Sequence, residues 1–247
     1  MQVSASTRCY GNESLGECCT KLVDHGFRKV ELCIGTDRVM APSEIAASPD
    51  QAQARFAETT RLTPVALDVE EDVDIATFKA IISFARLLKL TQITVPSSPV
   101  GTPFNTEIDR LRELTKMATE GAVMVSIKTA SGCLTEDPHT AVELCQSVKG
   151  LGITLDPSHY ICNTRGPVGY DMVFPHVYHC HFRDTLPEQL QVQAGLGQVD
   201  YSRTITMLRQ SGFDGAICVD LMPGTTEEGF EYPLEMRKLR MLLESLL

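Results

Sequence analysis

Short hydrophobic segments alternate with longer amphipathic segments along the whole chain. A short run rich in Val, Ile and Leu is typical of a parallel strand buried on both faces. Eight such runs occur, at Val3–Ser6, Lys29–Cys33, Pro64–Asp68, Gln92–Pro96, Val123–Lys128, Gly152–Asp156, Val177–Arg183 and Gly215–Leu221. The segments between them favour helices that cover the strands.

The helical segments repeat hydrophobic residues at three- and four-residue spacing. They are Ser14–Asp24, Asp50–Thr60, Ile75–Leu88, Asn105–Thr119, Pro138–Lys149, Tyr201–Gln210 and Tyr232–Leu246. Asp137 and Asp200 precede two of these segments as expected N-caps, and Gly26, Gly150 and Gly212 stand where helices should end. The segment after Asp156 is less regular, and a helical turn at Asp171–Phe174 is its best candidate.

Eight strand–helix units fit either a closed barrel or a doubly wound sheet. The strand count favours a (β/α)8 TIM barrel, and 247 residues suit one such domain spanning residues 1–247. The irregular stretches Thr36–Pro49, Thr185–Gly197 and Pro223–Glu231 would then lie over the active face, at the C-terminal ends of the strands.

Composition argues against several classes of protein, among them nucleic-acid-binding and membrane-spanning proteins. The 22 basic and 32 acidic side chains give a net charge of −10, and no stretch gathers Lys and Arg, which argues against nucleic acid. No hydrophobic run is long enough for a membrane span, and the N-terminal residues lack the pattern of a signal peptide. The nine cysteines, without a C-x-x-C, fit reduced thiols. We expect a soluble cytoplasmic protein, which could form a homo-oligomer.

Ionisable residues interrupt the hydrophobic strands near their C-terminal ends. They are Glu31, Asp68, Glu70, Lys128, Asp156, His159, His179, His181, Asp184 and Asp220. Charged groups are costly to bury unless they are paired or bind a metal. If the strands form one barrel, these side chains converge at its mouth and make the candidate active site.

Five of these residues have competing interpretations. Asp156 and His159 could present a carboxylate and an imidazole to one metal or substrate. Alternatively, Asp156 caps the following turn and His159 lies on the surface. His179 and His181 share one face of a strand and could bind a metal or a substrate, or be structural. Asp184 could fix an imidazole tautomer or cap the next turn.

Lys128 ends a hydrophobic strand, so its ammonium group leaves the strand end or enters the mouth. It could act as a cationic anchor, a proton donor or, with a lowered pKa, a base or Schiff-base nucleophile. The alternative is a salt bridge to Asp156 or Glu31. Arg165 and Arg183 could anchor an anionic group, or form ordinary salt bridges.

Several motifs, in this order, resemble those of one family. They are LVDHGFRKVEL at 22–32, IKTASGCLTEDP at 127–138, LGITLDPSH at 151–159, HCHFRDT at 179–185, GLGQVDY at 195–201 and GFDGAICVDL at 212–221. The chain resembles the xylose isomerase-like TIM barrels, a superfamily of sugar phosphate isomerases and epimerases (the AP endonuclease 2-type family) that also contains endonuclease IV.

The resemblance implies a divalent metal, Mn²⁺, Mg²⁺, Co²⁺ or Zn²⁺, held by a Glu on strand five, an Asp on strand six, a His on strand seven and a Glu on strand eight. Asp156 matches the strand-six Asp, and His181 matches the strand-seven His. His159 matches a His that contacts substrate or metal in relatives, and Glu31 matches a Glu that lines the pocket.

Two positions depart from the family pattern. Asp220 replaces the strand-eight Glu, and Lys128 replaces the strand-five Glu with a cation that cannot bind a metal until it loses its proton. The family's metal could therefore be absent. A weaker metal held by Asp156, His181 and Asp220 is the alternative.

The resemblance implies an isomerase, an epimerase or a related sugar lyase that moves a proton next to a carbonyl. Lys128 would supply the metal's positive charge, Asp220 or Glu31 would be the base, and His159 or His181 would bind sugar oxygens. His179, Arg183 and Asp184 would contact the sugar-like substrate. The alternative is a barrel that binds a small polyol or sugar acid without catalysis. An endonuclease is disfavoured, because the chain has six histidines and an acidic balance.

Overall fold

The computed structural model covers residues 1–247 and describes 1–11, 13–163, 166–223 and 230–247. Arg165 and most of the predicted loop at 223–231 lie outside the described residues.

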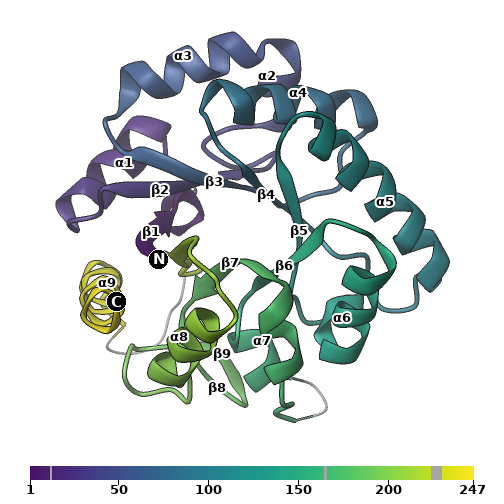
Figure 1. Ribbon diagram of the computed structural model, residues 1–247. Helices are drawn as coiled ribbons and strands as arrows, with labels where there is room; N and C mark the ends of the chain where they lie inside the picture. Colours follow the sequence, from purple (N-terminus) through teal and green to yellow (C-terminus); the bar gives the residue numbers. More distant parts are fainter. Residues whose placement is uncertain (12, 164–165, 224–229) are drawn as a thin grey trace.

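Eight parallel strands close into a barrel, which confirms the predicted fold class (Figure 1). The strands are β1 (Gln2–Ser6), β2 (Lys29–Ile34), β3 (Thr63–Val69), β4 (Gln92–Val95), β5 (Met124–Lys128), β6 (Leu151–Leu155), β7 (Val177–Phe182) and β10 (Ala216–Val219). They pair in chain order, and β10 closes the barrel against β1. The first and last barrel strands are therefore neighbours.

The covering helices surround the strands (Figure 1). They are α1 (Leu15–Asp24), α3 (Pro49–Thr59), α4 (Ile75–Leu87), α5 (Phe104–Glu120), α6 (Pro138–Ser147), α8 (Tyr201–Gln210) and α9 (Tyr232–Leu246). The side chain of Asp137 caps α6 and that of Asp200 caps α8, as predicted. Gly26, Gly150 and Gly212 follow helices with positive φ, a conformation that glycine adopts without strain.

Three connections differ from the sequence-based expectation. The stretch 36–49 contains a short helix, α2 (Pro42–Ala47), because Pro42 begins it and Ile45 is buried. The stretch 185–197 contains the antiparallel pair β8 (Asp184–Leu186) and β9 (Gln189–Val192). Between β6 and β7, the described residues form α7 (Ser158–Ile161) and a 3₁₀ helix, η3 (Asp171–His176), which is longer than the predicted turn at 171–174.

The barrel strands separate hydrophobic and polar side chains. In β4, the buried Ile93 and Val95 belong to the hydrophobic core, whereas Thr94 lies on the opposite face of the strand. The Thr94 hydroxyl contacts that of Thr154 at 2.7 Å, and Thr154 contacts Ser126 at 2.5 Å. TIM barrels commonly fill this space with branched hydrophobic residues. Here hydrogen-bonded hydroxyl groups lie beneath the charged residues of the mouth.

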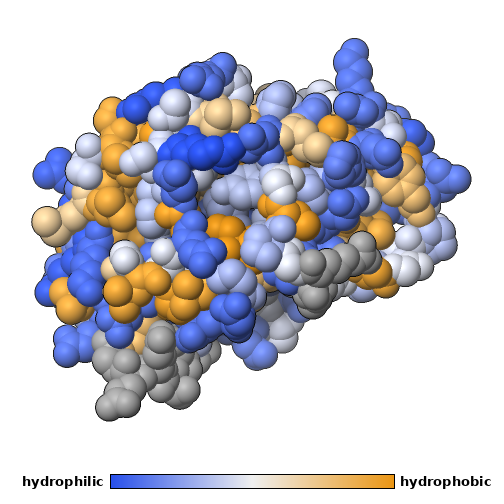
Figure 2. Space-filling model, turned by 90° about the horizontal axis from the view of Figure 1, so that it is seen from below, coloured by the Kyte–Doolittle hydropathy of each residue, from blue (hydrophilic) through white to orange (hydrophobic). Residues whose placement is uncertain are grey.

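None of the described helices is long and hydrophobic enough to cross a membrane. The face seen in Figure 2 mixes hydrophilic and hydrophobic side chains. Large exposed hydrophobic residues are scattered: Val23 lies on α1, Met241 on α9 and Leu196 in the connection between β9 and α8.

Candidate active site

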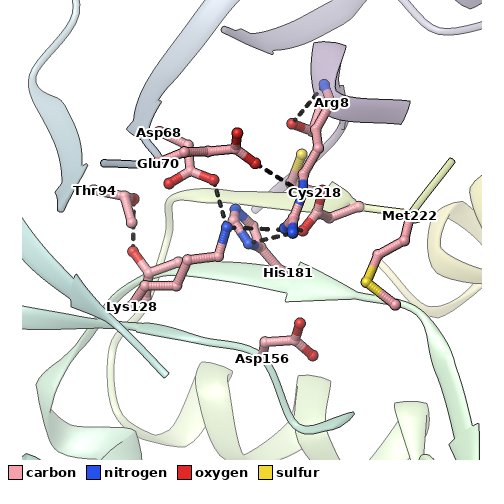
Figure 3. Close-up of polar contacts among 12 residues, drawn as sticks. Arg8, Asp68, Glu70, Thr94, Lys128, Asp156, His181, Cys218 and Met222 are labelled. Atoms are coloured by element: carbon pink, nitrogen blue, oxygen red, sulfur yellow. Dashed lines mark hydrogen bonds and ion pairs between the residues drawn. The ribbon is translucent and has the colours of Figure 1, made fainter. Parts of the chain in front are cut away.

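Charged side chains from six strands meet at one end of the barrel (Figure 3). Each lies at or directly after the C-terminal end of its strand: Arg8 after β1, Asp68 and Glu70 at the end of β3, Lys128 on β5, Asp156 after β6, His181 and Arg183 at the end of β7, and Asp220 after β10. The convergence predicted for the strand ends is therefore observed. Parallel strands bring their C-terminal ends to one face, which explains it.

Lys128, whose side chain is 12% exposed, forms an ion pair across the mouth with the buried Asp68. Its Nζ atom lies 2.5 Å from Oδ2 of Asp68 and 3.9 Å from Oδ2 of Asp220. Burial alone would lower the pKa of Lys128, but the two carboxylates outweigh burial and raise it. Lys128 is thus a cation and not a base, and its partners are not the predicted Asp156 and Glu31.

Arg183 lies between two buried carboxylates. Its Nη2 atom is 2.8 Å from Oδ2 of Asp156 and 2.9 Å from Oδ2 of Asp220, and its side chain is 1% exposed. The other oxygen of Asp156 accepts hydrogen bonds from the backbone amide and the hydroxyl of Ser158. Burial raises the pKa of Asp156, but Arg183 and the other partners lower it overall. The predicted substrate anchor Arg183 therefore compensates the charges of two carboxylates.

Asp220 has the largest number of cationic partners among the residues of this site. Besides Arg183 and Lys128, Nη1 of Arg8 lies 3.1 Å from Oδ2 of Asp220, and Nδ1 of His181 lies 3.4 Å from it. Burial would raise the pKa of Asp220, but Arg8, Lys128 and the other cations hold it far below the usual range. A carboxylate held this strongly in its charged form is a weak base.

Glu70 keeps part of its surface exposed. Its side chain is 21% exposed, whereas those of Asp68, Asp156 and Asp220 are 0% exposed. Oε1 of Glu70 lies 3.1 Å from Nε of Arg8, and Arg38 donates hydrogen bonds to both Glu70 oxygens. A ligand entering the mouth can therefore reach Glu70 without displacing the buried ion pairs.

His159 lies beside Asp156, as the motif suggested. Its Nδ1 accepts a hydrogen bond from the backbone amide of Ser131, so the neutral ring carries its proton on Nε2, which is 3.7 Å from Oδ2 of Asp156. Burial lowers the pKa of His159 to about 4, although Asp156 opposes this shift. The ring is neutral at neutral pH and 13% exposed, so it can donate a hydrogen bond to a ligand.

Two residues predicted to contact the substrate, His179 and Asp184, are buried outside the cluster of ion pairs at the mouth. His179 is 1% exposed inside the barrel, with Nε2 2.5 Å from Oε2 of Glu31. Asp184 is buried and accepts hydrogen bonds from the backbone amides of Thr185, Gly195 and Gly197. The geometry of Asp184 matches the capping alternative, because its carboxylate holds the loop after β7 in place. Substrate contact by either residue stays a prediction.

Glu31, predicted as a pocket residue and candidate base, is also fully buried. Its Oε2 lies 2.9 Å from Nε2 of His181, so both β7 imidazoles contact the same carboxylate. Burial would raise the pKa of Glu31, but His181 and His179 outweigh burial and hold it well below the usual range. A substrate in the mouth would have to pass Lys128 and His181 to reach it.

Sequence reasoning did not assign Arg8 or Arg38, and it gave no role to Asp68 or Glu70. Asp68 was visible as a charge at a strand end. Arg8 follows β1 after Ser6 and Thr7, and its position directly after a barrel strand is the signal that could have found it. Arg38 lies in a connection and shows no such pattern.

The residues that the resemblance implies as metal ligands do not fit an ion as they are arranged. Oδ2 of Asp156 and Oδ2 of Asp220 already contact the guanidinium of Arg183, and Lys128 stands at the position of the implied Glu. Three cations surround the site that a divalent ion would need. The ligand set Asp156, His181 and Asp220 stays a prediction.

Comparisons with known proteins agree with the barrel fold. The family model "Xylose isomerase-like TIM barrel" matches residues 19–240. The chain therefore belongs to the xylose isomerase-like TIM barrel family, as the sequence motifs suggested. No curated protein matches it at a significant level.

Solved structures with the same fold cover nearly the whole chain. A xylose isomerase-like TIM barrel protein from Mycobacterium smegmatis, in complex with magnesium, has a TM-score of 0.77 at 16% identity and covers 100% of this chain and 98% of its own. The 3-keto-D-glucoside 4-epimerase YcjR from E. coli has a TM-score of 0.73 at 14% identity, covering 98% and 99%. The probable 3-DHS dehydratase AsbF from Bacillus anthracis has a TM-score of 0.73 at 15% identity, covering 99% of each chain.

Proposed function

We propose that the protein is an isomerase or epimerase of a sugar or sugar-like acid, which moves a proton at the carbon next to a carbonyl. The observation that carries this proposal is the pair of partly exposed cations, Arg8 and Lys128, beside the partly exposed carboxylate of Glu70. Removing a proton next to a carbonyl creates an enediolate, and fixed cations stabilise its negative oxygen. The epimerase among the structural neighbours is consistent with this class of reaction.

Lys128 and Arg8 bind the carbonyl oxygen in this mechanism. Asp68 holds the Lys128 ammonium through an ion pair that needs no rearrangement during the reaction. The neutral imidazole of His159 donates a hydrogen bond from Nε2 to a neighbouring hydroxyl of the substrate. The cations thus perform the electrostatic role that the family resemblance assigns to a metal.

Glu70 moves the proton. It removes the proton from the carbon beside the carbonyl and returns it to the former carbonyl carbon, while the hydroxyl proton passes through solvent to the former carbonyl oxygen, giving an isomer. In an epimerisation, solvent water gives a proton to the opposite face of the first carbon, and Glu70 releases its own proton to solvent. Asp220 and Glu31, the bases suggested by the sequence, suit this role less well. Both are fully buried, and both have pKa values held well below the usual range by their cationic neighbours.

Solvent exchange tests this proposal without knowledge of the product. The protein is incubated in D₂O with ketoses, aldoses, uronic acids and sugar phosphates, and deuterium incorporation next to the carbonyl is followed by NMR. We expect exchange with at least one compound. Lys128→Met and Glu70→Gln should each lower the rate by about 100-fold or more, as expected for losing a charge that acts in the transition state.

Lys149→Met is the matched control, because Lys149 is exposed outside the mouth. Exchange at the wild-type rate in Lys128→Met would refute the role of the ammonium. Exchange lost equally in the control would point to instability.

A non-catalytic barrel that binds a polyol or sugar acid is the second candidate. The observation that favours it is the mutual neutralisation of the buried charges, since Asp156 and Asp220 are both engaged by Arg183. A binder would show a rise in melting temperature with a ligand but no deuterium exchange. An enzyme would show both.

A further inference from the structure

Four side chains of the types that bind transition metals meet inside the barrel, below the mouth. They are Glu31 from β2, His179 and His181 from β7, and Cys218 from β10. All four are buried, and their ligand atoms lie within 4.8 Å of one another. Nε2 of His179 and Nε2 of His181 both point at Oε2 of Glu31, at 2.5 and 2.9 Å, and Sγ of Cys218 lies 3.8 Å from Oε1.

We propose that these four residues form a buried site for one zinc-type transition metal ion. Two imidazole nitrogens, a thiolate and a carboxylate make a mixed nitrogen, sulfur and oxygen set of four, which is the number that zinc takes in structural sites. A thiolate and two imidazoles disfavour the hard ions Mg²⁺ and Ca²⁺, which prefer oxygen ligands. This set draws on β2, β7 and β10, and it differs from the ligand set implied by the family resemblance.

The surroundings of His181 support the inference independently. While Nε2 faces the cluster, Nδ1 lies 3.4 Å from Oδ2 of Asp220. Metal-binding histidines usually donate their second N–H group to a carboxylate, which fixes the ring and leaves the other nitrogen free to bind the ion. Nδ1 of His181 makes no hydrogen bond in this arrangement, but Asp220 is placed to accept one when an ion binds Nε2, and it also faces the mouth.

A pocket at the opposite end of the barrel shares His179 with the proposed site. A pocket of about 370 Å³ at the N-terminal ends of the strands is lined by residues that include Gln92, Met124, His179 and Phe213. His179 therefore connects the pocket with the interior cluster. An ion approaching from this end would not meet Lys128, Arg183 and Arg8, whose positive charges would repel it at the mouth.

Elemental analysis of the protein, purified without chelators from zinc-supplemented medium, tests the proposal. We expect close to one equivalent of zinc per chain. Protein produced with Co²⁺ in place of zinc should show the absorption of a thiolate bound to cobalt, a signal that requires Cys218 and is independent of activity. Cys218→Ala should abolish this absorption, and both Cys218→Ala and His179→Gln should reduce bound metal to the background.

Two matched controls locate the ion. Cys180→Ala removes an equally buried thiol, from β7, that is not part of the cluster, and it should keep the metal. Asp156→Asn alters the ligand set implied by the family and should keep the metal as well. Thermal unfolding of each variant confirms that it is folded.

Several outcomes would overturn the proposal. They are wild-type protein without stoichiometric metal after both zinc and cobalt supplementation, metal that survives in folded Cys218→Ala, or metal lost in Asp156→Asn but not in His179→Gln. None of these results depends on whether the proposed isomerase reaction is found.

Discussion

Nη2 of Arg183 lies 2.9 Å from Oδ2 of Asp220, and both side chains are buried at the centre of the barrel mouth. The same nitrogen contacts Asp156, so one guanidinium compensates two carboxylates that belong to different strands. Buried carboxylates of like charge repel each other unless a cation stands between them. Arg183 therefore allows these two side chains to coexist, as a metal would.

The first prediction concerns the stability that Arg183 provides. Arg183→Met keeps a long hydrophobic side chain but leaves Asp156 and Asp220 without their shared partner. Removing one member of a buried ion pair costs about 3–5 kcal/mol, and we expect a loss in this range in urea unfolding. Arg203→Met breaks an exposed pair with Asp171, which should cost at most about 1 kcal/mol. Similar losses in the two variants would contradict the bridging role.

The second prediction concerns the loop after β7. The Asp184 carboxylate accepts hydrogen bonds from the backbone amides of Thr185, Gly195, Gly197 and Val199. Asp184→Ala should destabilise the protein by about 3 kcal/mol or more, because buried donors lose a charged acceptor. Amide hydrogen exchange should accelerate across residues 185–199. Asp200→Ala, which removes the cap of α8, should cost only about 1 kcal/mol and leave that exchange unchanged.

The sequence predicted the barrel well because its signals are local. The hydrophobic runs located all eight barrel strands to within a few residues, and the Asp137 and Asp200 caps located two helix starts. The hairpin of β8 and β9 was missed, since its strands are only three and four residues long. The helix α2 was missed because its small residues resemble a loop.

The partners within the site could not be predicted in the same way. Lys128 and Asp68 come from strands that are separated by β4, and their contact depends on how far each side chain reaches into the closed barrel. Sequence spacing placed both at strand ends but could not choose between Asp68, Asp156 and Glu31 as the partner of Lys128. Arg8 was missed because its carboxylate partners lie far along the chain.

The third prediction concerns acid stability. Burial holds the pKa of His159 at about 4, whereas the pKa of a histidine in an unfolded chain is about 6.5. Between these values the unfolded chain binds a proton that the native protein does not, so this group lowers the free energy of unfolding as the pH falls from 6.5 towards 4. In His159→Asn the free energy of unfolding should fall less steeply over this pH range, by at most about 1.4 kcal/mol per pH unit. Urea unfolding at pH 5 and pH 7 measures the difference, and equal pH dependence in both proteins would refute the shift.

The last prediction asks whether cations replace the family's metal at the mouth. Lys128→Glu restores the carboxylate that the family resemblance implies on strand five, but Arg183 still contacts Asp156 and Asp220. We therefore expect Lys128→Glu alone to bind Mn²⁺ at the mouth no better than the wild type. The double variant, Lys128→Glu with Arg183→Met, frees both aspartates beside the new carboxylate. This double variant should bind Mn²⁺ at the mouth.

Titration with Mn²⁺, followed by electron paramagnetic resonance, measures this binding. Cys218→Ala is included in every protein of the series, so that an ion in the buried cluster does not contribute. Binding by the Lys128→Glu protein without the Arg183 substitution would show that the guanidinium yields to a metal. Lys128 would then be the residue that excludes the ion, and Arg183 would be a replaceable neighbour.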